Sequence, residues 1–317
     1  MDFTGGITFT GGMEITRQPP PSYKAIFGFG TTGSLADGSG DTAVTNLVTN
    51  TGVVGNDVTG VGDARYGLAA ARYGGDKAIF AYGTSVNTVN LVSNTGVVAT
   101  DSAGAGDPRF ALAAAGYGGD KAIFGYGTGP IDGATAITNL VSNTGVVASN
   151  TTGVGTVRVF LAAAGYGEDK AIFGYGQNNY GANLLSMTNL VSNTGVVASN
   201  TTGVGTARSF LAAAGYGSDK AIFGYGRLSQ FAGVSSTNLV SNTGVVATDT
   251  TGVGTVRCGL AAANYGEDKS IFGYGNSFGP SVNVSMTNLV SNTGVVATDT
   301  TGVGTARNCL AAAAYSG

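Results

Sequence analysis

Six arginines recur at equivalent places in a repeated segment, and their regular placement makes them the first candidates for chemistry. The segment GTARSFLAAAGYGSDKAIFGYG at residues 205–226 is typical of the repeat. The six are Arg65, Arg109, Arg158, Arg208, Arg257 and Arg307. A ring of guanidinium groups could hold an anion, or each guanidinium could hydrogen-bond carbonyl groups of the neighbouring glycine-rich loop and tie one repeat to the next. Because the same residue serves every repeat, we favour the structural role.

A second set of polar residues lies eight positions before these arginines, and its chemistry would be calcium binding. The set is Asp57, Asp101, Asn150, Asn200, Asp249 and Asp299. Two of its members are amides, and the chain has no D-x-D-x-D-G run with a distal glutamate, so a calcium loop is not indicated. We expect these side chains to cap turns through their own backbone, with no metal bound.

Catalytic residue types are scarce. The chain has no histidine, which removes the commonest general base and metal ligand. Cys258 and Cys309 follow their arginines by one and two positions, so they should face opposite sides of neighbouring strands and form no disulfide. Glu168 and Glu267 stand beside repeated aspartates in predicted turns, where carboxylates are normally solvated. The sequence therefore predicts a protein that is not an enzyme and needs no cofactor.

The composition excludes several partners. Charged residues make up 10% of the 317 residues and the net charge is −3, so there is no basic footprint for nucleic acid. No apolar run approaches the ~20 residues of a membrane helix, so membrane insertion is not expected. The start, MDFTGG, shows no secretory signal, which predicts synthesis in a cytoplasm.

Constant spacings show which elements must position these residues. Arg65 lies 12 residues before Lys77 and 19 residues after Asn46, and both intervals recur in the other repeats. In contrast, 22 residues separate Lys24 from Asn46 and only 13 separate Lys77 from Asn90. All variation in length is therefore confined to one connection in each repeat. The constant parts read as four short strands, LAAA-x-YG, DKAIFGYG, TNLVSN and VVATD, joined by tight turns.

Four antiparallel strands in a repeat of this length predict a blade of a β-propeller, and the ends of the chain are consistent with it. The chain stops after a first strand and its repeats start with a second strand. We predict an all-β, six-bladed β-propeller of four-stranded antiparallel blades. Pairing the C-terminal strand 310–317 with the N-terminal strand 23–30 would close the ring. Residues 23–317 form the propeller, and residues 1–22 form an N-terminal arm with a Pro-rich spacer.

The repeat resembles the Kelch repeat over residues 23–317. The resemblance rests on an arginine before the first strand, small apolar residues within it, and a second strand ending in glycine, as in TARSFLAAAGYGSDKAIFGYG. Gly-Tyr-Gly replaces the double glycine of that family, and the tryptophan expected late in the repeat is absent. The resemblance implies a propeller and leaves the function open. The uniform repeats and glycine-rich start also resemble bacteriophage virion proteins, such as tail, fibre or decoration proteins.

The six variable connections should gather on one rim, where loops on a rigid scaffold commonly carry recognition. Neutral drift is the alternative, since loop insertions cost little. We predict that residues 177–187, 227–236 and 276–286 contact a partner. Aromatic, arginine and amide side chains there suit sugars or protein hot spots. The predicted contact residues are Asn178, Asn179, Tyr180, Arg227, Gln230, Phe231 and Phe278.

Three functions stay open on this evidence. The first is a virion or particle surface component that recognises a cell-surface glycan or protein, with the N-terminal arm contacting other virion proteins. The second is a purely structural virion decoration or assembly protein. The third is a cytoplasmic Kelch-like adaptor, although no adaptor domain accompanies the repeats.

Overall fold

The repeat folds into short antiparallel strands. The computed structural model describes residues 23–33, 39–84, 86–129, 133–178, 183–278 and 282–317, and within these ranges it contains strands and no helix. The strands form six three-stranded sheets, one for each repeat, and four two-stranded sheets. Residues 1–22, the predicted arm and spacer, lie outside the described residues. No helix in the described part of the chain could cross a membrane.

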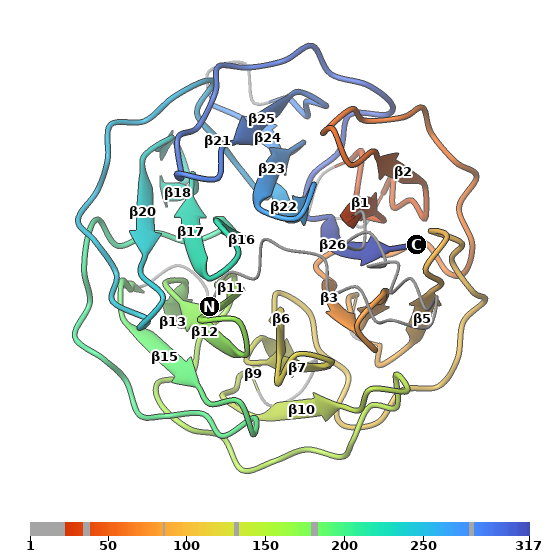
Figure 1. Ribbon diagram of the computed structural model, residues 1–317, viewed down its shortest axis with the longest axis horizontal. Helices are drawn as coiled ribbons and strands as arrows, with labels where there is room; N and C mark the ends of the chain where they lie inside the picture. Colours follow the sequence, from red (N-terminus) through yellow and green to blue (C-terminus); the bar gives the residue numbers. More distant parts are fainter. Residues whose placement is uncertain (1–22, 34–38, 85, 130–132, 179–182, 279–281) are drawn as a thin grey trace, which may run out of the picture.

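Each three-stranded sheet places its strands in the same order from the centre of the molecule outward (Figure 1). The innermost strands are β3 (Ala69–Tyr73), β6 (Ala113–Tyr117), β11 (Ala162–Tyr166), β16 (Ala212–Tyr216), β22 (Ala261–Tyr265) and β26 (Ala311–Ser316). The middle strands are β1 (Tyr23–Gly28), β4 (Lys77–Ala81), β7 (Lys121–Gly125), β12 (Lys170–Gly174), β17 (Lys220–Gly224) and β23 (Lys269–Gly273). The outer strands are β2 (Thr45–Val48), β5 (Val89–Val92), β10 (Thr138–Val141), β15 (Thr188–Val191), β20 (Thr237–Val240) and β25 (Thr287–Val290).

The middle strands form the core because neighbouring sheets cover both of their faces. In β17, Ala221, Ile222 and Phe223 are all 0% exposed, which explains the uninterrupted apolar run in the sequence. The Phe223 ring lies directly over Gly174 of the preceding sheet, where an added Cβ would be 2.7 Å from its Cζ. The glycine that ends β12 therefore makes room for the next sheet's phenylalanine, and burial of each such ring contributes about 1.5–3 kcal/mol.

The two ends of the chain pair with each other, as predicted. β26 lies antiparallel to β1 in a continuous register from Tyr23 opposite Ser316 to Gly28 opposite Ala311. The C-terminal strand thus supplies the innermost strand of the sheet whose middle and outer strands begin the chain. No other three-stranded sheet combines segments from both ends of the chain.

Backbone hydrogen bonds join neighbouring sheets just before the innermost strands. The residue two places after each repeat arginine donates its N–H to the carbonyl of the equivalent residue in the preceding sheet. The bond from Gly67 to Cys309 joins the sheet of β3 to the sheet that contains the C-terminal strand β26. The six bonds run from Gly67 to Cys309, Cys309 to Gly259, Gly259 to Phe210, Phe210 to Phe160, Phe160 to Ala111 and Ala111 to Gly67, at 2.7–2.9 Å. Figure 1 shows the six sheets disposed around the centre in the same order.

The predicted fourth strand is not formed. In place of a ladder, single bridges such as Val92–Val98 and Val89–Ser102 hold this segment to the outer strand. Between the bridges, the side chain of Asn90 donates to the carbonyl of Ala99 at 3.0 Å. In a regular ladder, the Ala99 carbonyl would accept a hydrogen bond from a backbone N–H of the outer strand. Because the buried side-chain amide of Asn90 in the NLV motif occupies this carbonyl, the ladder does not form and the sheets have three strands.

Candidate functional site

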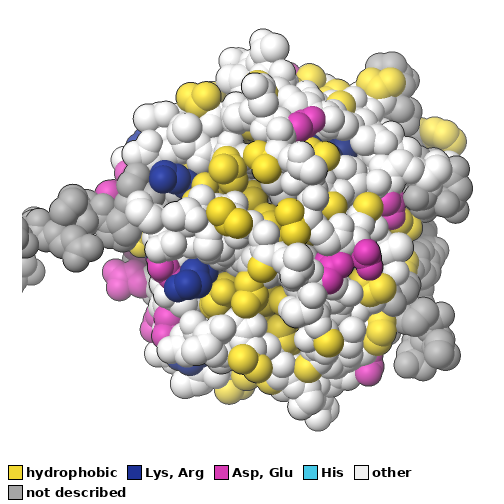
Figure 2. Space-filling view, turned by 90° about the vertical axis from the view of Figure 1, so that its right-hand side faces the viewer, with side chains coloured by type: hydrophobic (Ala, Val, Ile, Leu, Met, Phe, Trp, Pro, Cys, Tyr) yellow, Lys and Arg dark blue, Asp and Glu magenta, His cyan; other side chains and the backbone are white. Residues whose placement is uncertain are grey.

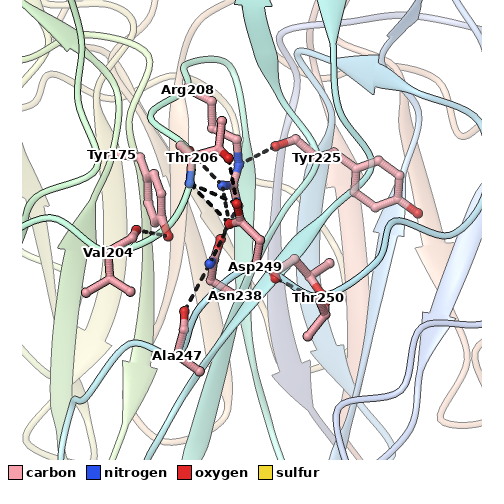
Figure 3. Close-up of polar contacts among 10 residues, drawn as sticks. Tyr175, Val204, Thr206, Arg208, Tyr225, Asn238, Ala247, Asp249 and Thr250 are labelled. Atoms are coloured by element: carbon pink, nitrogen blue, oxygen red, sulfur yellow. Dashed lines mark hydrogen bonds and ion pairs between the residues drawn. The ribbon is translucent and has the colours of Figure 1, made fainter.

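The repeat arginines lie inside the molecule. Each is at most 1% exposed, so none can present its guanidinium to a dissolved anion. Arg208 donates from Nε to the Tyr225 carbonyl at 2.8 Å, from Nη1 to the Thr206 carbonyl at 3.0 Å, and from Nη2 to Asn238 Oδ1 at 2.7 Å (Figure 3). Its guanidinium carbon also lies 4.5 Å from the ring centre of Tyr175 in the preceding sheet. These contacts fix the guanidinium group to its own sheet and stack it on a ring of the preceding sheet.

The tyrosines under these guanidinium groups are fixed as well. The Tyr175 hydroxyl donates to the Val204 carbonyl at 3.1 Å, within the glycine-rich loop that leads to Arg208. Burial raises the pKa of Tyr175 to about 12, despite the nearby positive charge of Arg208. The ring therefore stays neutral and serves as a stacking surface between two sheets.

The residues eight places before the arginines do not cap turns through their own backbone, which corrects the sequence interpretation. Asp249 accepts hydrogen bonds from the Thr206 N–H and hydroxyl at 3.0 and 2.5 Å, and from Asn238 Nδ2 at 2.8 Å. Asn200 makes the matching contacts with Thr156 in its own sheet, accepting at Oδ1 and donating from Nδ2. An aspartate and an asparagine can therefore both bind the threonine that lies two positions before the repeat arginine, which explains why both residue types occur in this set.

The other polar groups that the sequence singled out are the turn carboxylates and the two cysteines. The Asp169 and Asp268 carboxylates each pair with the adjacent lysine at 3.0 Å, while Glu168 stands exposed at a turn with φ +70°. Both cysteines are free, and burial raises the pKa of Cys258 to about 11, so its thiol stays protonated at neutral pH. Within the described ranges, no three residues of the His, Cys, Asp and Glu types could together hold a metal ion.

The variable connections lie at the face where the innermost strands begin. Each of four connections begins beside the residue that follows a repeat arginine: Phe110 bridges Thr128, Val159 bridges Gln177, Ser209 bridges Arg227 and Cys258 pairs with Asn276. The connections also contain the small strands β8 (Thr128–Gly129), β9 (Gly133–Ala134), β13 (Gln177–Asn178), β14 (Asn183–Leu184), β18 (Arg227–Ser229), β19 (Ala232–Gly233) and β24 (Asn276–Ser277), while β21 (Arg257–Cys258) pairs with β24. These pairings anchor the connections to the rigid sheets.

Arg227 belongs to a stack of flat groups on this face. Its guanidinium carbon lies 4.2 Å from the ring centre of Phe210. The Phe210 ring in turn stacks on Phe160, with ring centres 3.6 Å apart and an interplanar angle of 16°. Phe160, at the end of the stack, is half-buried. The stack thus joins the connection that contains Arg227 to the segments that lead into β16 and β11, and it holds the arginine in place.

The remaining predicted residues differ in their surroundings. Phe231 is 87% exposed at the turn between β18 and β19, and Gln230 beside it is exposed too. Phe278 is half-buried because its ring lies over Gly233, where an added Cβ would meet Cε2 at 2.3 Å. Consecutive connections 227–236 and 276–286 therefore touch. Asn178 is half-buried in β13, and Asn179 and Tyr180 lie outside the described residues.

Sequence reasoning missed the aromatic residues that follow the repeat arginines. Phe160 and Phe210 occupy a position held elsewhere by Gly67, Ala111, Gly259 and Cys309, and every residue at this position has a positive φ. A bulky ring in the left-handed region is costly, and it marks a place where the surroundings fix the backbone. The change from glycine to phenylalanine at this position stands out in the otherwise uniform repeat, and it could have indicated these rings from the sequence.

A comparison with protein-family models and a comparison with curated proteins both find no match for the chain.

Proposed function

We propose that the chain is a closed six-bladed β-propeller with a Kelch-like repeat that binds a partner through its variable connections. The six sheets, the pairing of β26 with β1 and the hydrogen bonds that pass from sheet to sheet and return to the first support the closed ring. A ring without open edges resists fraying and provides a rigid base for loops.

The partner is a cell-surface glycan or protein, and the chain is a surface component of a virion or comparable particle. The observation that carries this proposal is Phe231, an aromatic side chain 87% exposed on the connection that also holds the stacked Arg227. An exposed ring and a fixed cation on the same connection offer apolar area together with directed hydrogen bonds, which both sugars and protein hot spots use. Gln230 adds an amide at the same turn.

Binding to a glycan array and to intact cells tests this function. We expect the fluorescently labelled chain to bind, and Phe231→Ser to weaken binding at least tenfold without a change in melting temperature, because the ring makes few contacts within the chain. Val86→Ser is the matched control, since Val86 is 36% exposed on the short connection at residues 84–88, outside the three predicted contact segments, and offers no ring. Binding that is equal in the wild type and Phe231→Ser would refute the role of this connection. Binding to cells and to no glycan would identify a protein partner.

The function we propose is non-catalytic. The aspartates beside Glu168 and Glu267 are paired with lysines, and the Cys258 thiol is held in its protonated form. Hydrolysis of a glycan or an ester by the purified chain, lost on substitution of one carboxylate, would refute this assignment.

A purely structural role in a virion is the second candidate, and one observation favours it. Every sheet exposes a valine on the turn beyond its outer strand, with 61–66% of the residue accessible, and Figure 2 shows hydrophobic side chains spread over the outer wall on the side of β2 and β5. The six are Val53, Val97, Val146, Val196, Val245 and Val295. If they are the contact, a combined Val→Ser variant loses incorporation into particles, measured by mass spectrometry, while the variant Phe231→Ser is incorporated normally.

A further inference from the structure

A cavity of about 530 Å³ lies where the six innermost strands meet. Each of these strands contributes lining residues, mainly alanines such as Ala114, Ala163 and Ala262. Small-molecule sites in proteins typically have volumes of about 300–1,000 Å³, so the space suits a small organic ligand. The cavity is distinct from the variable connections, because it is lined by the strands and by the turns that join the innermost to the middle strands.

The walls depart from the repeat at one position. The fourth residue of the innermost strands is glycine in three sheets and alanine in another, but arginine in β3 and asparagine in β22. The six are Arg72, Gly116, Gly165, Gly215, Asn264 and Ala314, and all line the cavity. At this level of the wall, Arg72 and Asn264 are therefore the two polar side chains among glycines and an alanine. The carboxylates of Glu168 and Glu267 line the cavity farther along, at the turns between the innermost and middle strands.

Arg72 is held in place but keeps binding capacity. Its guanidinium carbon lies 4.3 Å from the ring centre of Tyr23, and its Nη2 donates to the Tyr23 hydroxyl at 3.3 Å. Its Nε is buried and has no hydrogen-bond partner among the described residues. The nearest aspartate in its own hairpin, Asp76, is engaged with Lys77 at 2.8 Å. Within the described part of the chain no carboxylate lies within ion-pair distance of Arg72.

Tyr23 also departs from the repeat, and this change accompanies Arg72. The residue before the lysine is aspartate in the other five sheets, as in Asp120 before Lys121, whereas Tyr23 precedes Lys24. The sheet that contains both chain ends thus lacks the local carboxylate and supplies a flat ring on which the guanidinium stacks. The ring orients the guanidinium without neutralising it.

A second part of the wall, where β22 meets β16, is adjusted too. Asn264 accepts a hydrogen bond from the Gly215 N–H at 3.1 Å, and an added Cβ on Gly215 would lie 2.7 Å from Asn264 Nδ2. Lys121, Lys170 and Lys220 line the cavity at the turns, and each is paired with the aspartate before it. The positive charge of these lysines is therefore balanced locally, in contrast to that of Arg72.

The geometry points to the cavity as a binding site for a small organic monocarboxylate with an apolar body. The ligand carboxylate would accept hydrogen bonds from the Arg72 guanidinium, whose planar donors match a carboxylate in two-point pairing. The apolar body would lie against the alanine walls.

Saturation-transfer NMR and calorimetry with acetate, butyrate and benzoate test the site, with benzamide as the uncharged match of benzoate. We expect at least one carboxylate to bind the full chain and benzamide to bind at least tenfold more weakly. Arg72→Gln should weaken carboxylate binding at least tenfold. Lys77→Gln is the matched control, because it removes one positive charge from the same hairpin but Lys77 does not line the cavity, and it should leave binding unchanged.

A second variant separates binding from stability, since Arg72→Gln also loses the Tyr23 stack. Ala163→Leu fills the cavity from another strand and leaves Arg72 untouched, so it should abolish benzoate binding while the chain remains folded by circular dichroism. The proposal is overturned if none of the three carboxylates binds the wild type, if benzamide binds as well as benzoate, or if binding survives both Arg72→Gln and Ala163→Leu.

Discussion

Arg208 shows how one buried side chain can join two sheets. It gives three hydrogen bonds to its own sheet and stacks on Tyr175 of the preceding one, while its pKa is lowered by burial. The Asp249 carboxylate forms a longer ion pair with it, 3.8 Å from Nη1. Carbonyl and amide oxygens therefore provide most of the compensation for the buried charge.

Replacing Arg208 with methionine should lower the free energy of unfolding by about 2–4 kcal/mol, because the Tyr225 carbonyl and Asn238 Oδ1 lose a buried donor and the stack is lost. Urea unfolding followed by circular dichroism measures the change. Lys220→Met is the control, since the partly exposed side chain of Lys220 forms an ion pair with the adjacent Asp219 at the turn. Equal stability of both variants would contradict the structural role.

Asp249, Asn200 and their equivalents fix the segment that follows each outer strand. Burial raises the pKa of Asp249, but hydrogen bonds from Thr206 and Asn238 and the charge of Arg208 outweigh it, so the pKa lies below its usual value of 3.8. The pKa of Asp57 and that of Asp299 are lowered in the same way. Stability from these groups is present above the unfolded pKa and is lost as the pH falls through the lower folded value.

The triple variant Asp57→Asn, Asp249→Asn, Asp299→Asn should therefore fold normally at pH 7 and lose less stability than the wild type below about pH 4. Asn150 and Asn200 already fill this place in two sheets, which is why the substitution is tolerated. Melting temperatures measured from pH 7 to pH 2.5 give the comparison. An unchanged acid dependence would mean that other carboxylates control it.

Most of the strand pattern could be predicted from the sequence, and the failures have local causes. The constant intervals placed the strands of all six sheets, because tight Gly-Asp-Lys turns and alternating burial leave little choice of register. The predicted fourth strand does not form, because the side chains of Asn90 and its equivalents take hydrogen bonds that the ladder would need. The stack of Arg227, Phe210 and Phe160 was not predictable, since it depends on which turns meet across neighbouring sheets.

For the whole molecule, the pairing of β26 with β1 joins segments from opposite ends of the chain. Removing residues 310–317 should abolish cooperative unfolding, because it deletes an innermost strand and uncovers β1. Differential scanning calorimetry would show no sharp transition. A truncated chain that melts like the wild type would contradict the role of this pairing.

A circular permutant provides the matched control. Tyr315 and Lys24 are paired as Tyr73 and Lys77 are in their hairpin, so a direct bond from Gly317 to Tyr23 recreates the same turn. With new ends between Gly119 and Asp120, the permutant should keep its melting temperature within a few degrees. Failure of the permutant to fold would show that chain order, beyond the pairing itself, is required.

The variable connections pair with residues at the face where the innermost strands begin, and we propose that they bind the partner. The most direct measurement is binding to cells and glycans after residues 177–187, 227–236 and 276–286 are each replaced by TSVNT, the connection at residues 84–88. Because the connections are anchored to sheets that do not change, the exchanged chain should keep its melting temperature and lose binding. Undiminished binding by a folded exchange variant would contradict the proposed role of these connections.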